Sequence, residues 1–329
     1  MSESLTDWKS LHGSAFEGMP VLVTGGAGFI GSHLATALHE LGGRVRVLDD
    51  LSGGGDPAAL PKGVEFTRGS ILDANALNQC AQGRRIVFHL AALGSVPASI
   101  AQPGPYGQVN VTGTLNVLEA ARVARCDRVI FSASSSAYGD SPTLPKTESM
   151  PPHPLSPYAA TKLAGEGLMS AWSASFGLDT VSLRYFNIFG PRQNANSAYA
   201  AVIAAFATAI LAGRRPVIYG DGEQSRDFTY VDNAVQANLL AARSQTALKG
   251  AVINIACGRR VSVNELAALL ASAAHRPELK PEYRPPRAGD VRHSLADLTV
   301  AATLLGYEPI VAFEAGLAAT LAWYRDRVR

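Results

Sequence analysis

Cysteine is scarce in this chain, and its few copies do not cluster. The 329 residues include only three cysteines, Cys80, Cys126 and Cys257, which lie far apart in the sequence. Such a distribution excludes both a zinc-ligand motif and a disulfide framework. We therefore expect no metal centre, and a reducing, cytoplasmic setting.

Charge of one sign and long apolar runs are also missing. The formal net charge is +2, charged residues make up 17%, and Lys and Arg form no long run. A nucleic-acid surface is therefore not expected. The longest charge-free apolar run, 198–212, is short and Ala-rich, so we predict a buried helix and no membrane insertion. The first eighteen residues lack the apolar core of a signal peptide.

What the chain has instead is an alternation of strand-like and helix-like segments. Apolar residues make up 47%, enough for a large core. Strands that alternate with helices predict an α/β fold with a doubly wound, Rossmann-type parallel sheet, whose ligands bind at the carboxyl ends of the strands. We predict strands at 20–24, 44–48, 64–66, 86–90, 128–132, 180–184 and 252–255, and helices at 32–41, 110–124, 158–176 and 232–242.

A glycine-rich loop follows the first predicted strand. Gly25, Gly28 and Gly31 recur at three-residue intervals before a predicted helix. This strand–loop–helix context is typical of a dinucleotide site, where backbone N–H groups approach a pyrophosphate. Asp49 ends the second strand, where a carboxylate binds the ribose 2′-OH and repels a 2′-phosphate. The pattern favours NAD over NADP.

Tyr158 and Lys162 are four residues apart in a predicted helix, so they share one face. We expect the ammonium to lower the phenol pKa, which makes the pair a proton-transfer device near neutral pH. The strand 128–132 runs into Ser134, whose hydroxyl would share a substrate proton with the tyrosine. Two other strands run into polar residues at 91–95 and 184–187, and these should converge on the same edge.

In combination, several motifs spread over residues 20–323 carry a resemblance to a known family. They read TGGAGFIGS, HLAALGSVP, SASSSAYGD, SPYAATK, LRYFNIFGPRQ, GDGEQSRDFTYVDN and GDVRHSLAD. The chain resembles the extended short-chain dehydrogenases/reductases, and among them the nucleotide-sugar 4-epimerases, above all bacterial UDP-N-acetylglucosamine 4-epimerases. That family implies NAD as a recycled cofactor, a UDP-sugar substrate and a homodimer formed through helices 110–124 and 158–176.

The resemblance also implies roles for individual residues. Tyr158 would be the acid/base, Lys162 its electrostatic partner and a nicotinamide-ribose ligand, and Ser134 the hydroxyl on the reacting sugar oxygen. The implied cofactor-binding residues are Gly25, Gly28, Phe29, Ile30, Asp49, Ser70, Ile71, Leu90, Ala91, Ala92, Asn110, Tyr158, Lys162 and Tyr185. The implied substrate-binding residues are Gly94, Ser95, Ser135, Ser136, Asn187, Gln193, Ala201, Val202, Tyr219, Arg226, Arg287, Asp290 and Ser294.

Three serines separate this chain from relatives. The family usually has Gly-Asp-Ile where this chain has Gly69-Ser70-Ile71, so the adenine loses a carboxylate partner, for which Asp73 is a candidate substitute. Sugar 4,6-dehydratases carry Asp and Glu where this chain has Ser135 and Ser136, which do not titrate near neutral pH. The related decarboxylases carry Glu at the second place. Of the reactions that the resemblance implies, epimerisation at one carbon is therefore the one that remains.

The second half should form a smaller mixed α/β domain that binds the nucleotide sugar. We expect residues 1–187 and 231–257 in the NAD-binding domain, and 188–230 and 258–329 in the substrate domain, with the nucleotide in the cleft between them. In the family, a small residue at the position of Ser294 accompanies N-acetyl sugars and a tyrosine accompanies plain hexoses. Two alternative functions remain open: a UDP-glucose or UDP-uronate 4-epimerase, and a non-catalytic NAD-binding regulator.

Overall fold

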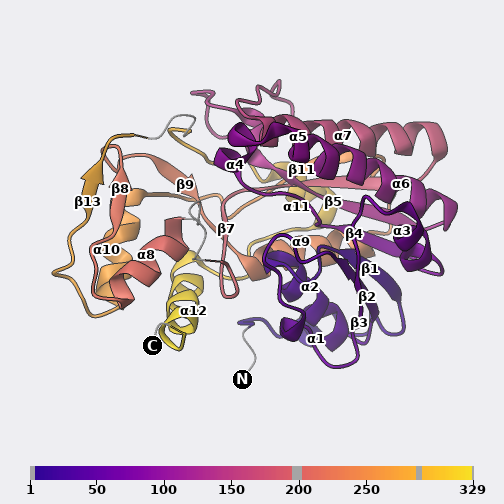
Figure 1. The fold of residues 1–329 in the computed structure, drawn as a ribbon, viewed down its shortest axis with the longest axis horizontal. Helices are drawn as coiled ribbons and strands as arrows, with labels where there is room; N and C mark the ends of the chain where they lie inside the picture. The colour runs from indigo at the N-terminus through magenta and orange to yellow at the C-terminus, as the bar shows by residue number, and fades with distance from the viewer. Residues whose placement is uncertain (1–3, 195–201, 287–290, 328–329) are drawn as a thin grey trace.

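A seven-stranded sheet, parallel throughout, forms the centre of the computed structural model, which describes residues 4–194, 202–286 and 291–327 (Figure 1). The strand order β11-β6-β5-β4-β1-β2-β3 steps outward in both directions from β1, as a doubly wound sheet requires. The predicted fold class is confirmed. The strands are β1 (Pro20–Thr24), β2 (Arg44–Asp49), β3 (Glu65–Arg68), β4 (Ile86–His89), β5 (Arg128–Ser134), β6 (Asp179–Tyr185) and β11 (Ala251–Ile255).

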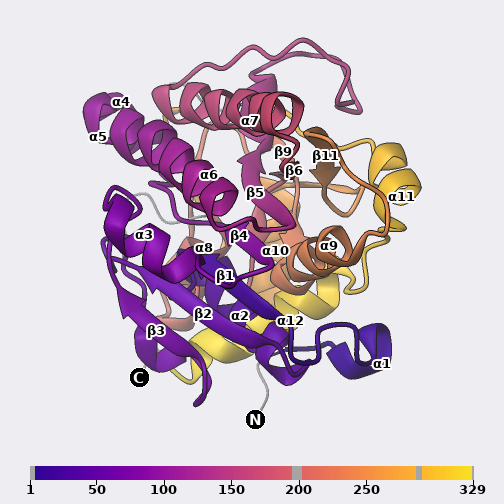
Figure 2. The same ribbon diagram turned by 90° about the vertical axis from the view of Figure 1, so that its right-hand side faces the viewer.

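Helices cover both faces of this sheet (Figure 2). Because successive side chains of a strand point to opposite faces, Val21 and Val23 of β1 pack on one side and Leu22 on the other. The first side carries α1 (Trp8–His12), α2 (Phe29–Glu40), α9 (Val231–Arg243) and α11 (Thr299–Leu305). The second carries α3 (Ala74–Ala81), α4 (Val96–Ala101), α5 (Pro103–Tyr106), α6 (Gly113–Val123) and α7 (Pro157–Phe176).

Several predicted boundaries move by a few residues. Helix α2 begins at Phe29 because Gly28 is its N-cap, so the last glycine of the loop already lies in the first turn. The predicted helix 110–124 is regular only from Gly113, and a π-helical segment (Gly107–Thr112) precedes it. Two 3₁₀ turns, Pro57–Ala59 and Ser135–Tyr138, complete this part of the chain.

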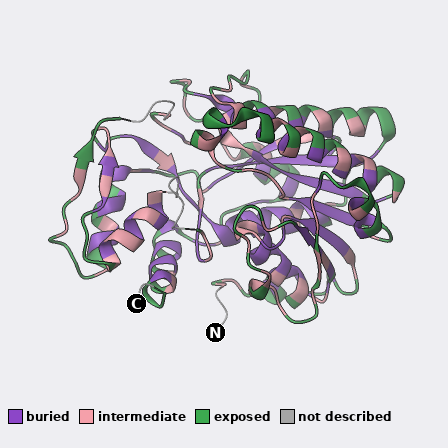
Figure 3. Cartoon of the chain, in the orientation of Figure 1, coloured by how far each residue is buried: buried purple, intermediate pink, exposed green. Residues whose placement is uncertain are grey.

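A second hydrophobic core lies beside the sheet, as Figure 3 shows by the buried residues of the smaller lobe. Its helices are α8 (Val202–Leu211), α10 (Val263–Ala273) and α12 (Phe313–Arg325). Three two-stranded pairs join them: β7 (Ile188–Phe189) with β10 (Thr229–Tyr230), β9 (Ser225–Asp227) with β12 (Arg260–Ser262), and β8 (Val217–Tyr219) with β13 (Glu282–Arg284). The division into two domains stays a proposal. Helix α11 falls within the range expected for the substrate domain, yet it packs against strand β11 and helix α9.

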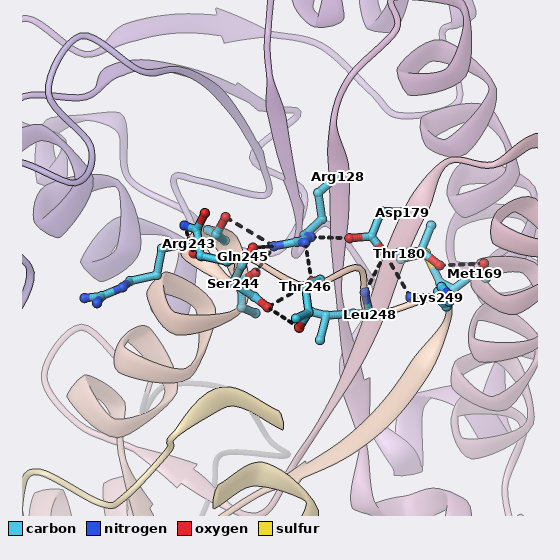
Figure 4. A network of polar contacts seen from close by, with 12 residues as sticks. Arg128, Met169, Asp179, Thr180, Arg243, Ser244, Gln245, Thr246, Leu248 and Lys249 are labelled. Carbon is cyan, nitrogen blue, oxygen red and sulfur yellow. Dashed lines mark hydrogen bonds and ion pairs between the residues drawn. The ribbon is translucent and has the colours of Figure 1, made fainter. Parts of the chain in front are cut away.

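Arg128 ties the amino end of β5 to its neighbours (Figure 4). Its Nε donates to Asp179 Oδ2 on β6 at 2.6 Å. Its Nη1 donates to Ala241 O at 2.6 Å and Ser244 O at 3.1 Å, and its Nη2 to Thr246 O at 2.9 Å. These carbonyls belong to the end of α9 and the segment after it, where helical carbonyls lack intrahelical partners. One guanidinium therefore joins β5, β6 and α9.

We predict that Arg128→Met lowers the free energy of unfolding by about 3–5 kcal/mol, because it leaves the largely buried Asp179 carboxylate without its counterion. Urea unfolding measures this change. The exposed pair Arg85–Asp127, with side chains 61% and 52% accessible, supplies the control. Arg85→Gln should cost less than about 1 kcal/mol. Equal losses of unfolding free energy in the two variants would show that the Arg128 network stabilises the fold no more than an exposed ion pair does.

Candidate active site

A cleft of about 1250 Å³ runs from the β1–α2 loop, past the carboxyl ends of the strands, to the smaller lobe. Most of the residues singled out from the sequence line it. The catalytic candidates Ser134, Tyr158 and Lys162 share this cleft with the glycine loop. This is the edge at which parallel α/β sheets bind ligands.

The glycine loop is closely packed. Gly25 has φ +71°, and a Cβ there would lie 2.6 Å from Ala91 N. A Cβ on Gly31 would lie 2.1 Å from Gly25 O, so the first turn of α2 can approach the loop only without a side chain. The amino end of α2, with Gly28 as N-cap, lies at the cleft. Its first N–H groups lack intrahelical partners and fit a pyrophosphate.

The carboxylate of Asp49 lies next to this loop. Its Oδ2 accepts from Ala27 N at 2.9 Å, and its Oδ1 accepts from Leu51 N at 2.8 Å. Asp49 is buried, yet it lines the cleft. Because each carboxylate oxygen can accept more than one hydrogen bond, the group can hold the loop and also bind ribose hydroxyls. The loop and the carboxylate together fit NAD.

The region around Ser70 offers less to an adenine than the sequence suggested. Ile71 lines the cleft, but Ser70 does not, and its Oγ accepts from Leu72 N at 3.2 Å. Asp73, the candidate substitute, caps α3 by accepting from Asn75 N and Ala76 N. In this structure both side chains therefore serve the local turn.

Tyr158 and Lys162 lie in the first turns of α7. Ser156 caps this helix with its Oγ, which accepts from Ala159 N, and Pro157 occupies the first helical position. The Lys162 ammonium donates to Ser132 O at 2.7 Å, at the end of β5. The predicted helix and its shared face are confirmed, since both side chains reach the cleft.

Burial governs the protonation of this pair. It raises the pKa of Tyr158, and a hydrogen bond with Ser134 acts in the opposite direction. It lowers the pKa of Lys162 to about 8, which the Glu166 carboxylate partly opposes. The expectation of a lowered tyrosine pKa is wrong for this structure, because the loss of hydration outweighs the neighbouring groups.

Asn110 supports the site from the π-helical segment without lining the cleft. Its Oδ1 accepts from Leu93 N at 2.8 Å, and its Nδ2 donates to Leu93 O at 3.1 Å and to Thr161 Oγ1 at 3.0 Å. Thr161 Oγ1 in turn donates to Tyr158 O. The amide thus holds the loop after β4 against the helix that carries the tyrosine.

Ser134 is prepared to act as a donor. Ser136 directs both its N–H, at 3.2 Å, and its hydroxyl, at 2.9 Å, toward Ser134 Oγ. Because that oxygen already accepts hydrogen bonds, the Ser134 proton is available to Tyr158 or to a substrate oxygen. Ser135 and Ser136 line the cleft beside it, and neither is a carboxylate.

Comparisons with known proteins agree with this geometry. The model of the NAD dependent epimerase/dehydratase family matches residues 21–256. The chain belongs to this family. It is 40% identical over 315 residues to the UDP-glucose 4-epimerase of Mycolicibacterium smegmatis, covering 94% of this chain and 99% of that relative. The predicted relationship to the UDP-sugar 4-epimerases is confirmed at the level of the family.

Two solved structures of the family are similar over nearly the whole fold. One is the UDP-N-acetylglucosamine 4-epimerase of Methanobrevibacter ruminantium in complex with UDP-N-acetylmuramic acid, with 41% identity, a TM-score of 0.90 and coverage of 94% of this chain and 99% of that one. The other is the UDP-glucose 4-epimerase of Thermotoga maritima with UDP-glucose, with 39% identity, a TM-score of 0.90 and coverage of 94% and 100%.

The remaining positions suggested by the resemblance to this epimerase/dehydratase family fall into two groups. Those that line the cleft are Phe29, Ile30, Leu90, Ala91, Ala92, Gly94, Ser95, Tyr185, Asn187, Gln193, Val202, Tyr219, Arg226 and Ser294. Ala201, Arg287 and Asp290 lie outside the described residues. Gln193 Nε2 donates to Ile188 O, while its buried Oε1 has no hydrogen-bond partner among the described residues. Ser294 Oγ donates to Asn187 Oδ1 at 3.4 Å.

Three residues in or next to the cleft were not predicted from the sequence. Tyr106 accepts from Ser95 N at 3.2 Å, and its ring meets that of Tyr158 edge-on at 6.5 Å. Lys146 is buried, lines the cleft and donates to Ser141 O. Glu166 lies one helical turn beyond Lys162, and its i,i+4 spacing was the one signal that could have revealed it.

We predict that Gly31→Ala greatly reduces the NAD retained after purification, because the new methyl group would displace the backbone of the loop. Gly104→Ala is the matched control, since a Cβ there meets nothing within 4 Å. The measurements are released NAD after denaturation and the midpoint of thermal unfolding. Full NAD content in the Gly31 variant would contradict the assigned cofactor loop.

Proposed function

We propose that this protein is an NAD-dependent 4-epimerase of UDP-N-acetylglucosamine and UDP-N-acetylgalactosamine. The coarser statement, that it is a UDP-sugar 4-epimerase and therefore an isomerase, follows from its family and from relatives aligned over nearly their full length. The observation that carries the chemistry is the meeting of Ser134, Tyr158 and Lys162 in one cleft with the glycine loop. A non-catalytic regulator would not need this trio.

Bound NAD would accept and return a hydride at C4 of the sugar. The Tyr158 phenolate, aided by the Ser134 hydroxyl, would take the proton of the 4-OH, and the phenol so formed would later return that proton to the 4-keto sugar. Lys162, fixed by Ser132 O, would keep a positive charge next to this tyrosine and so favour the phenolate that the first step needs. Arg226, whose Nη1 donates to Ser225 O and Arg292 O, would bind the diphosphate while the sugar turns.

The preference for acetamido sugars rests on Ser294. Its side chain is small, 8% exposed, and lines the cleft near Asn187. A small wall leaves room for a C2 acetamide. The M. ruminantium enzyme, named for UDP-N-acetylglucosamine, gives this reading some support. The alternatives are a UDP-glucose 4-epimerase, favoured by the name of the M. smegmatis relative, and a UDP-uronate 4-epimerase.

The experiment that tests the function is incubation of the purified protein with single UDP-sugars and NMR analysis of the products. We expect conversion of UDP-N-acetylglucosamine and UDP-N-acetylgalactosamine into one another, with slower conversion of the glucose and glucuronate pairs. No conversion of any of these sugars, with NAD present, would overturn the proposal.

We also propose a homodimer and a cytoplasmic location. Helices α6 and α7 lie side by side on the outer face of the sheet, and Leu115, Val123 and Phe176 on them are exposed. In the described residues no helix is long and apolar enough to span a membrane.

Tyr158→Phe should lower kcat by about 10²–10⁴-fold, because general acid–base groups contribute that much. The fold should be unchanged by circular dichroism, since only a hydroxyl is lost. Tyr283→Phe removes an exposed phenol from β13 and should leave kcat as it is. Near-full activity in the Tyr158 variant would assign the proton transfer to another group.

Ser294→Tyr should abolish turnover of the acetamido sugars while sparing the plain hexoses, because overfilling a packed pocket costs about 1–3 kcal/mol or more. Ser294→Ala keeps the wall small and should keep the wild-type preference. The measurement is kcat/KM for both pairs of sugars in each variant. If the ratio between the pairs is the same in all three proteins, Ser294 does not select the substrate.

A further inference from the structure

A buried ion pair lies directly behind the catalytic lysine. Arg184, near the end of β6, donates from Nε to Glu166 Oε1 at 2.8 Å and from Nη2 to Glu166 Oε2 at 2.7 Å. The two side chains are only 4% and 5% exposed. Glu166 lies four residues after Lys162 on α7, so the carboxylate and the ammonium share one face of the helix. The proton-transfer steps above do not use this pair.

Other ionisable groups near Lys162 contribute no charge. His89 on β4 is held between Thr24 and Thr114, and burial lowers its pKa to about 3, so the ring is neutral. Tyr185 on β6 is also buried, which raises its pKa. On α7 itself, burial raises the pKa of Tyr158. Among the described residues, the charges that face Lys162 are therefore those of Glu166 and, behind it, Arg184.

Arg184 is held in place from its other side. Its guanidinium lies over the ring of Tyr138, 4.6 Å from the centroid, and the Tyr138 hydroxyl donates to Asn254 Oδ1 at 2.7 Å. The two-pronged contact with Glu166 leaves the carboxylate little freedom to rotate. The three charges are thus arranged in a fixed order: ammonium, carboxylate, guanidinium.

We propose that the Glu166–Arg184 pair is a positioning element that sets the charge state of Lys162. The carboxylate favours the protonated lysine, and the guanidinium limits how strongly it does so. Burial opposes the ammonium and Glu166 favours it, and burial outweighs the carboxylate, so the pKa of Lys162 is lowered to about 8. The inference deepens the proposed function, because Lys162 is there the partner of the proton-transferring tyrosine.

The two members of the pair should act in opposite directions. Glu166→Gln removes the attraction and leaves the Arg184 charge, so the pKa of Lys162 should fall by on the order of one unit. Arg184→Gln removes the counterion of Glu166, whose charge then acts on Lys162 alone, so the pKa should rise by a similar amount. A merely structural pair would not give shifts of opposite sign.

Lysine NMR measures this directly and without turnover. The chain has only six lysines: Lys9, Lys62, Lys146, Lys162, Lys249 and Lys280. Protein labelled with ¹³C at lysine Cε and saturated with NAD is titrated with base, and the Lys162 signal is assigned by its loss in Lys162→Arg. The pH profile of kcat/KM for UDP-N-acetylglucosamine is recorded on the same proteins.

Asp179→Asn is the matched control. It breaks another ion pair of β6, the largely buried pair with Arg128 at the opposite end of the strand. It should lower the midpoint of thermal unfolding but leave the Lys162 titration unchanged. Glu166→Asp keeps the charge and should restore most of the wild-type titration. If Glu166→Gln does not fold, the upward shift in Arg184→Gln carries the test.

Three results would overturn the inference. The Lys162 titration could be unchanged in both Glu166→Gln and Arg184→Gln, it could shift in the same direction in both, or it could shift equally in Asp179→Asn. The alkaline limb of kcat/KM should move with the lysine pKa. If the titration shifts as expected but no UDP-sugar is converted by the wild type, the proposed function fails while the electrostatic role of the pair stands. If sugars are converted but the titration does not move, the electrostatic role of the pair fails while the proposed function stands.

Discussion

A positive charge on a buried lysine is the constraint on which the site depends. Withdrawing an ammonium from water is costly unless acceptors replace its hydration. Lys162 donates to the Ser132 carbonyl near the end of β5, and the Glu166 carboxylate adds a stabilising negative charge. The ammonium can stay charged only while β5 and α7 keep this relative position.

The sheet secures that position through contacts far from the chemistry. Gly25 must pass close to Ala91, so the loop after β1 and the loop after β4 are in contact. Asn110 then joins the β4 loop to Thr161 of α7. At the other edge, Arg128 ties β5 to β6 and α9. These contacts therefore hold Tyr158 and Lys162 of α7 and the cofactor loop against the same set of strand ends.

Local patterns in the sequence were sufficient for much of this arrangement. Short apolar runs located all seven strands of the sheet to within a few residues, and the loop from Gly25 to Gly31 and the helix of Tyr158 lie as predicted. Contacts between distant segments were not readable. The strands β7 and β10 have only two residues each and pair across the chain, which no periodicity reveals. The partner of Glu166 comes from another strand.

Charge states were the least predictable feature. The four-residue spacing of Tyr158 and Lys162 suggested a lowered tyrosine pKa, but burial, a property of the whole fold, raises it. The roles of Ser70 and Asp73 likewise depended on local geometry, in which Ser70 accepts from Leu72 N within a turn and Asp73 caps α3. The residue types indicated which groups could transfer protons, whereas burial in the folded protein determines their pKa values.

The most direct test of 4-epimerisation by this protein follows the hydrogen on C4 of the sugar. UDP-N-acetylglucosamine carrying deuterium at C4 is incubated with the NAD-loaded protein in ordinary water, and both epimers are analysed by NMR and mass spectrometry. Oxidation and reduction at one carbon within one cleft predict that deuterium stays on C4 in substrate and product. Formation of the epimer with loss of deuterium to water would contradict that mechanism.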